Sequence, residues 1–120
     1  MTKRNIVHIE IPTRDFEESG EFYKKLFGWK VTPMPEMNYS MWESAESPGG
    51  GFNPLGEDVK VDSVLIYIDS DDIAADLKKA KTLGATIIKY ISEIPGYGWF
   101  GIFKDLTGNS IALFKATNPS

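Results

Sequence analysis

Two residues near the start of the chain, His8 and Glu10, carry side chains suited to acid–base or metal chemistry. They lie in the segment Ile6–Ile11, whose alternating apolar residues predict a β-strand. Residues two apart in a strand share a face, so the imidazole and the carboxylate are expected side by side. Glu10 is then a candidate general base, or half of a weak metal-binding pair with His8. The alternative for Glu10 is a solvated residue at a sheet edge.

Aromatic residues provide the next candidates, because Tyr39, Trp42, Tyr97 and Trp99 fall in or beside predicted strands. Such residues suit the lining of a site for a flat or apolar ligand. Aromatics in strands are also ordinary core or interface residues, and we expect that role for at least half of these four.

The elements that position these residues follow from hydrophobic periodicity and from turn residues. Strand Ile6–Ile11 is expected to end at Pro12, which cannot donate to a ladder. Asp15 predicts a helix N-cap, Glu18 completes a capping box, and Gly28 marks the helix end. Further strands are predicted over residues 29–32, 38–43, 64–68, 85–91, 98–104 and 110–114, with a second helix capped by Asp71 or Asp72 and closed by Gly84.

The second half of the chain repeats the pattern of the first. With an offset of 57 residues, residues 8–26 contain five identities at the strand face, the helix cap and the helix end: Ile9/Ile66, Ile11/Ile68, Asp15/Asp72, Lys24/Lys81 and Leu26/Leu83. Each half therefore predicts β-α-β-β-β, and a ferredoxin-like β-α-β-β-α-β order is the alternative. The offset makes Tyr67 the counterpart of Glu10, as a phenol that either binds a substrate oxygen or packs with its hydroxyl at the rim.

Glycines 49–51 form the least certain predicted strand. They lack the Lys-Ser/Thr ending and the following helix of a phosphate loop. The triplet indicates instead a close approach of backbones within a strand.

Composition narrows the class of protein. The 120 residues suffice for one domain, and the net charge of −4 argues against a nucleic-acid partner or an anionic membrane. The absence of cysteine excludes disulfides, thiolate zinc sites and cysteine nucleophiles, and one histidine cannot form a His-rich metal cage. No secretory signal or membrane-spanning run is present, so a cytoplasmic location is expected.

The tandem pattern resembles the vicinal oxygen chelate superfamily, which includes glyoxalase I, bleomycin-resistance proteins, fosfomycin-resistance enzymes and extradiol dioxygenases. The resemblance covers nearly the whole chain, and the motifs that carry it are His8–Pro12, Phe22–Tyr23, Phe27–Trp29, Gly49–Gly51, Asp71–Ile73, Ile94–Phe100 and Phe103–Asn109. It implies a single α+β domain over residues 1–120, with module one at 1–55 and module two at 62–116. The two modules are expected to form a curved open barrel.

In this superfamily the concave face holds a divalent metal such as Zn²⁺, Ni²⁺ or Mn²⁺, bound by His or Glu from the first and last strands of each module. The resemblance places such a ligand at His8. The other family positions fall on Leu65, on Ala112 and near Gly51 or Phe52, none of which carries a metal donor. A metal site normally needs at least three protein donors, so a degenerate site is expected.

Three functional hypotheses follow. The first is a protein that binds a small organic molecule in a cup containing His8, Glu10, Tyr67 and the aromatics Tyr39, Trp42 and Trp99, with no working metal site. The second is a metal-dependent lyase or isomerase of the lactoylglutathione lyase type, with His8 and Glu10 as the surviving ligands. The third is a domain that acts in assembly without a ligand. The resemblance also implies a homodimer, in which modules pair within or between chains.

Overall fold

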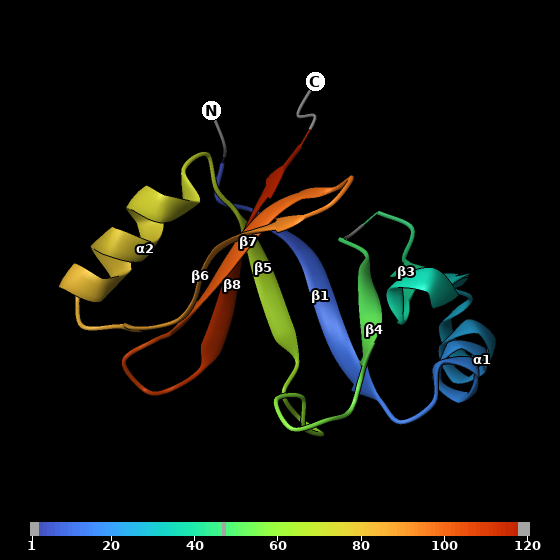
Figure 1. Cartoon of the computed structure of the whole chain (residues 1–120). Helices are drawn as coiled ribbons and strands as arrows, with labels where there is room; N and C mark the ends of the chain where they lie inside the picture. The colour runs from blue at the N-terminus through green and yellow to red at the C-terminus, as the bar shows by residue number, and fades with distance from the viewer. Residues whose placement is uncertain (1–2, 47, 118–120) are drawn as a thin grey trace. The chain divides into compact units, whose positions relative to one another are not determined.

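The computed structural model describes residues 3–46 and 48–117, and its elements run β-α-β-β-β twice along the chain (Figure 1). The first set comprises β1 (Ile6–Thr13), α1 (Phe16–Phe27), β2 (Lys30–Met34), the 3-10 helix η1 (Pro35–Met37), β3 (Tyr39–Glu43) and β4 (Gly50–Pro54). The second set comprises β5 (Leu65–Asp69), α2 (Ile73–Thr82), β6 (Thr86–Ile94), β7 (Gly98–Lys104) and β8 (Ser110–Ala116). This order confirms the predicted α+β fold and excludes the ferredoxin-like alternative.

The chain divides into two compact units, one of residues 7–65 and one made of the residues on either side. From here on, module one means β1 to β4 with α1, and module two means β5 to β8 with α2. Strands of module one are adjacent in the order β2-β3-β4-β1, and only β1 and β4 run parallel. Module two repeats this arrangement as β6-β7-β8-β5, with β5 and β8 parallel.

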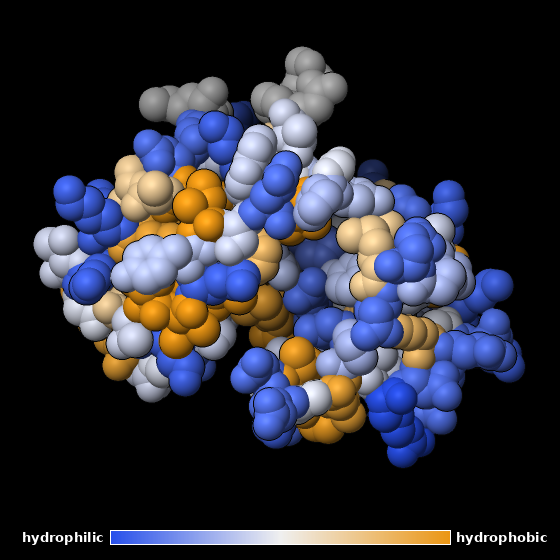
Figure 2. Space-filling model, viewed as in Figure 1, coloured by the Kyte–Doolittle hydropathy of each residue, from blue (hydrophilic) through white to orange (hydrophobic). Residues whose placement is uncertain are grey.

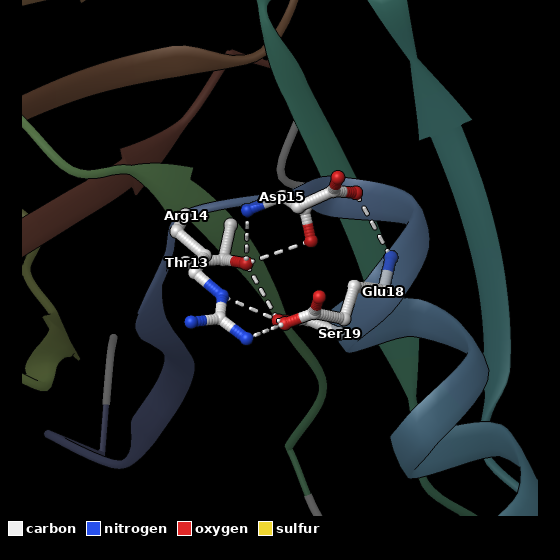
Figure 3. A network of polar contacts seen from close by, with 5 residues as sticks. All are labelled: Thr13, Arg14, Asp15, Glu18 and Ser19. Carbon is white, nitrogen blue, oxygen red and sulfur yellow. Dashed lines mark hydrogen bonds and ion pairs between the residues drawn. The ribbon is translucent and has the colours of Figure 1, made fainter.

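The start of α1 is fixed by short polar side chains (Figure 3). The Asp15 carboxylate accepts from the backbone N–H of Glu18 at 3.0 Å, which confirms Asp15 as the N-cap. The predicted capping box is only half formed, because the Asp15 N–H donates to the Thr13 hydroxyl at 3.0 Å. The Glu18 carboxylate instead accepts from Arg14 Nε at 2.8 Å.

The ends of the helices follow the sequence signals. Gly28 has a φ of 74°, and its N–H donates to Lys24 O at 2.8 Å, so it closes α1 as predicted. Asp72 is the cap of α2, since its carboxylate accepts from Ala75 N at 3.0 Å. Gly84 follows α2 with a φ of 108°, a conformation that glycine adopts without strain.

Each helix packs on one face of the strands of its own module. In module one, Trp42 stacks on Trp29 with ring centroids 4.1 Å apart, and Tyr23 of α1 stacks on the fully buried Phe52 of β4. In module two, the core cluster consists of Ile73, Leu77 and Leu113, with Ile68, Ile87, Trp99 and Phe103 packed against it. No helix in the described part of the chain is long and apolar enough to span a membrane.

Two strand ends predicted at prolines were wrong. Strand β1 continues through Pro12, which pairs with Asn53, and β2 contains Pro33. A proline removes one ladder donor but keeps its carbonyl and an extended φ, so a strand can pass through it where no bond to its nitrogen is needed.

Candidate functional site

Three polar side chains of module one form a hydrogen-bonded chain: His8, Tyr39 and Glu10. His8 Nε2 lies 2.7 Å from the Tyr39 hydroxyl, which donates to Glu10 Oε2 at 2.7 Å. All three residues are partly buried. His8 and Glu10 come from β1 and Tyr39 comes from β3, so β4 lies between the strands that supply them.

The strand register shows which face of the module-one strands carries the cluster. In β1, Ile9 and Ile11 alternate with His8 and Glu10, and Ile11 pairs with Phe52, which faces α1. His8 and Glu10 therefore lie on the face away from α1. We call this the open face of module one.

Glycine 51 gives Tyr39 its position over β4. Gly51 pairs with Glu10 on one side and Met41 on the other, so it lies on the open face. The three atoms nearest to a Cβ built on Gly51 all belong to the Tyr39 phenol, and each lies closer than real contacts allow. The phenol therefore occupies the space of a side chain at position 51. The predicted close approach of backbones is found at Gly50, beside the Ile9 carbonyl, whereas at Gly51 the close neighbour is a side chain.

The direction of the hydrogen bonds sets the protonation of the cluster. When Glu10 is ionised it only accepts, so Tyr39 donates its single hydroxyl proton to Glu10 and His8 Nε2 is the donor to Tyr39. Burial lowers the pKa of the His8 imidazole below its ordinary value of 6.5. Near neutral pH the ring is then neutral, with its proton on Nε2.

Asn53 adds an unsatisfied acceptor to the open face. It lies two residues beyond Gly51 in β4, and among the described residues its buried Oδ1 has no hydrogen-bond partner. Buried polar atoms without partners are rare and costly in folded proteins. A ligand that carries a hydroxyl or N–H donor, or an ordered water molecule, would satisfy this oxygen.

The donor set does not fit a divalent metal held by the protein alone. In the described part of the chain no group of three or more His, Cys, Asp or Glu side chains is placed to hold an ion. On the open face, His8 and Glu10 are the candidate donors, and each already has a hydrogen-bond contact with the Tyr39 hydroxyl. A metal bound by His8 Nε2 would have to replace that contact.

The aromatic residues expected to line the site separate into different environments. Tyr39 joins the cluster, whereas Trp42 lies on the opposite face of β3 and is 4% exposed within the stack under α1. Its indole N–H donates to Gly51 O at 3.2 Å. Trp42 is thereby held in the core of module one and is not brought into the cluster.

The candidates of module two lie on different surfaces of that module. Tyr67 is 7% exposed and pairs with Ala112, on the strand face away from α2. Trp99 packs against the helix-side cluster formed by Ile73, Leu77 and Leu113. Tyr97 is exposed in the turn that joins β6 to β7.

Module two also carries an apolar groove that the sequence did not indicate. It lies between α2 and β6 and is lined by Ala74, Leu77, Lys78, Lys81, Ile87, Tyr90 and Ile91. Figure 2 shows apolar side chains gathered over α2 and β6, on the left of the view. The groove contains no carboxylate or imidazole, so it offers apolar contact and lysine charge but no acid–base pair.

Part of module one resembles a known protein family in sequence. Residues 5–44 match the family model described as bleomycin resistance protein-like N-terminal. This segment contains β1, α1 and β3, and with them His8, Glu10 and Tyr39. No curated protein matches the chain significantly.

Solved structures share the fold over nearly the whole chain. A glyoxalase/bleomycin resistance/dioxygenase superfamily member from Vibrio splendidus 12B01 has a TM-score of 0.68 and 15% identity, covering 94% of this chain and 99% of its own. Methylmalonyl-CoA epimerase from Streptomyces coelicolor, in complex with 2-nitronate-propionyl-CoA, has a TM-score of 0.68 and 16% identity, covering 98% and 100%. The Mn(II)-bound glyoxalase from Novosphingobium aromaticivorans has a TM-score of 0.69 and 16% identity, covering 93% of this chain and 38% of the glyoxalase.

The protein thus has the fold of the glyoxalase/bleomycin resistance/dioxygenase class. The family match over residues 5–44 and the shared fold over nearly the whole chain support the predicted resemblance to the vicinal oxygen chelate superfamily.

Proposed function

We propose that the protein binds a small organic molecule on the open face of module one, at the His8–Tyr39–Glu10 cluster, without a protein-held metal. The observation that carries the proposal is the hydrogen-bonded chain itself, with two bonds of 2.7 Å on a sheet face that no helix of its module covers. Such a chain fixes donors and acceptors in place, which favours selective binding of a polar group.

The polarity of the face indicates the kind of ligand. The buried Asn53 Oδ1 requires a donor, and the Glu10 carboxylate disfavours a nearby anion. Met41, which pairs with Gly51, adds an adaptable apolar surface next to the cluster. A flat or apolar molecule bearing a hydroxyl or N–H group fits these features.

Glu10 is the group best placed for proton transfer if the protein is an enzyme. Its carboxylate accepts from Tyr39, which in turn contacts His8, so a proton taken up by Glu10 would reorder both hydrogen bonds. We assign Glu10 the role of general base in that case.

The alternative is a metal-dependent lyase or isomerase of the lactoylglutathione lyase type. It is favoured by the fold of the Mn(II)-bound glyoxalase and by the placement of His8 and Glu10 on one face. The limited donor set argues against it, because substrate, water or a second subunit would have to supply the remaining ligands.

The test is a binding screen followed by amide-resolved NMR. The uniformly ¹⁵N-labelled chain is titrated with aromatic alcohols and aromatic amines, with aromatic acids as the class that Glu10 should disfavour, and chemical-shift changes are mapped onto the fold. We expect changes centred on residues 8, 10, 39 and 53. Tyr39→Phe should weaken binding about tenfold, because one hydrogen-bonded hydroxyl is removed.

Tyr90→Phe is the matched control, because Tyr90 lines the α2–β6 groove and is 63% exposed. Binding that responds to Tyr90→Phe but not to Tyr39→Phe would contradict the proposed site. Elemental analysis of protein purified without chelator tests the alternative. About one Zn, Ni or Mn per chain, lost in His8→Ala, would favour the metal-dependent enzyme.

A further inference from the structure

The contact between Tyr39 and Gly51 determines which chemistry the open face can support. Gly51 is buried, and a side chain there would collide with the hydroxyl oxygen, Cζ and one ring carbon of Tyr39. The glycine is therefore required by the position of the phenol. Removing the phenol would leave room for a side chain at position 51.

Position 51 is also a place from which a third metal donor would reach His8 and Glu10. Gly51 is the direct ladder partner of Glu10, and adjacent strands lie about 4.8 Å apart. A carboxylate at position 51 would project from the same face, next to Glu10 and near His8. Phe52 does not offer this position, because it faces α1 and stacks on Tyr23.

We propose that Gly51 is the residue that excludes a metal from this face, because it seats the Tyr39 phenol where a metal-binding side chain would project. The inference rests on the proposed function, and it names the residue that makes the site suited to an organic molecule and not to a metal ion. Tyr39 then serves as a hydrogen-bonding replacement for a coordinated ion: its hydroxyl bridges His8 and Glu10 and fills the space between them. Gly51 acts through Tyr39, so it is a positioning residue.

The direct experiment restores the missing donor. Gly51→Glu combined with Tyr39→Ala places three donors, His8, Glu10 and the new carboxylate, on one face and removes the phenol. We expect this variant to retain about one Mn²⁺ or Zn²⁺ per chain after incubation with the chloride salt and desalting. The unsubstituted chain and the control Gly51→Ala/Tyr39→Ala should retain less than about one tenth of that amount.

A third substitution identifies the ligands. Adding His8→Ala to the metal-binding variant should abolish retention, because two carboxylates alone make a weak and incomplete site. Retention that survives His8→Ala would place the ion elsewhere and overturn the inference. Stoichiometric metal in the unsubstituted chain, bound through His8, would overturn it as well.

A double-mutant cycle tests the positioning role even if the metal variant fails to fold. Gly51→Ala should lower the urea midpoint in the parent chain, because its Cβ displaces the phenol. In the Tyr39→Ala background, the same substitution should lower the midpoint much less, since the atoms it would meet are gone. Equal losses in both backgrounds would contradict the inference.

Spectroscopy separates positioning from a merely structural role. In Gly51→Ala, the His8 ring resonances should change as they do in Tyr39→Phe, because both substitutions break the bond between His8 and Tyr39. An unchanged His8 spectrum in folded Gly51→Ala would contradict the proposed role of the glycine.

These outcomes are distinct from a failure of the proposed function. If no organic ligand binds but the metal variant gains its ion, the proposed function fails and the role of Gly51 stands. If ligands bind through Tyr39 and the metal variant stays empty, the binding function stands and the role of Gly51 fails.

Discussion

The two modules share one architecture but present different chemistry on the strand faces opposite their helices. Both place a parallel first and last strand side by side, with Glu10 opposite Gly51 in module one and Tyr67 opposite Ala112 in module two. The registers are therefore equivalent. Module one carries a hydrogen-bonded polar cluster at these positions, whereas module two carries packed aromatic and apolar residues.

Most of the equivalent positions on this face are polar in module one and apolar or aromatic in module two. Matched by offset and register, the pairs with the module-one residue first are His8/Leu65, Glu10/Tyr67, Gly51/Ala112, Tyr39/Phe100 and Asn53/Phe114. The residues that face the helices and the residues that cap them are similar in the two modules, because they fix the packing of each helix on its strands. The opposite face is free to diverge, so this is where the difference in function is expected.

The largest expected effect is on the module-one core. Trp42→Ala should reduce the free energy of unfolding by about 4 kcal/mol, because it removes a buried indole and leaves a cavity in the aromatic stack. Urea unfolding provides the measurement. Trp99→Ala, at a more exposed position in module two, should cost less, and equal losses would contradict the difference in packing.

Alanine at a strand glycine should also cost more in module one. In Gly50→Ala the new Cβ meets the Ile9 carbonyl, which is backbone, so β1 and β4 must separate. We expect a loss of about 3 kcal/mol. Gly101→Ala in module two meets side-chain atoms of Leu77 and Ile73 at 2.9 and 3.0 Å and the Lys89 carbonyl oxygen at 3.3 Å. These contacts are longer than the one between Gly50 and the Ile9 carbonyl, so the substitution should cost less. The reverse order would contradict this account of the glycine triplet.

The edges of the two modules offer a test of the expected homodimer. Edge strand β6 exposes Ile88, Tyr90 and Ile91, whereas β2 at the edge of module one contains Pro33. Light scattering should give twice the chain mass of 13.4 kDa. Tyr90→Glu should shift the mass toward the monomer, and Thr32→Glu on β2 should not. A monomeric mass for the unsubstituted chain would contradict the expected homodimer.

The smallest effect is a pH dependence of stability that originates in module one. Because burial holds the pKa of folded His8 below 6.5, the unfolded chain binds the proton more tightly. The contribution of His8 to the free energy of unfolding should be fully present above pH 6.5 and should decrease as the pH falls toward the pKa of folded His8. His8→Gln should flatten this part of the curve. If the free energy of unfolding of His8→Gln falls equally with pH, the pH dependence comes from the carboxylates and not from His8.

Local signals allowed most of the fold to be predicted from the sequence. Alternation identified the strands, and Asp15, Gly28 and Gly84 marked the ends of helices as the structure has them. The repeat supplied the module order. Strand ends at Pro12 and Pro33 were misjudged, because a single missing donor does not end a strand whose neighbours remain paired.

The candidate site was only partly predictable. Strand alternation placed His8 and Glu10 on one face, but the bond to Tyr39 depends on a register across β4, and the sequence does not encode that register locally. Alternation within residues 39–43 also puts Tyr39 and Trp42 on opposite faces, although the first hypothesis placed both in one cup. Gly51 and Asn53 were missed as partners of the site, although glycines facing a strand aromatic could have suggested the close contact.

The most direct test of the central claim is the long-range ¹H–¹⁵N NMR spectrum of His8, the chain's single histidine. If the open face of module one is a hydrogen-bonding site, the ring at pH 7.5 is the neutral Nε2–H tautomer, and added Zn²⁺ or Mn²⁺ leaves it unchanged apart from nonspecific broadening. A ring deprotonated at Nε2 that shifts stoichiometrically with Zn²⁺ would contradict the account.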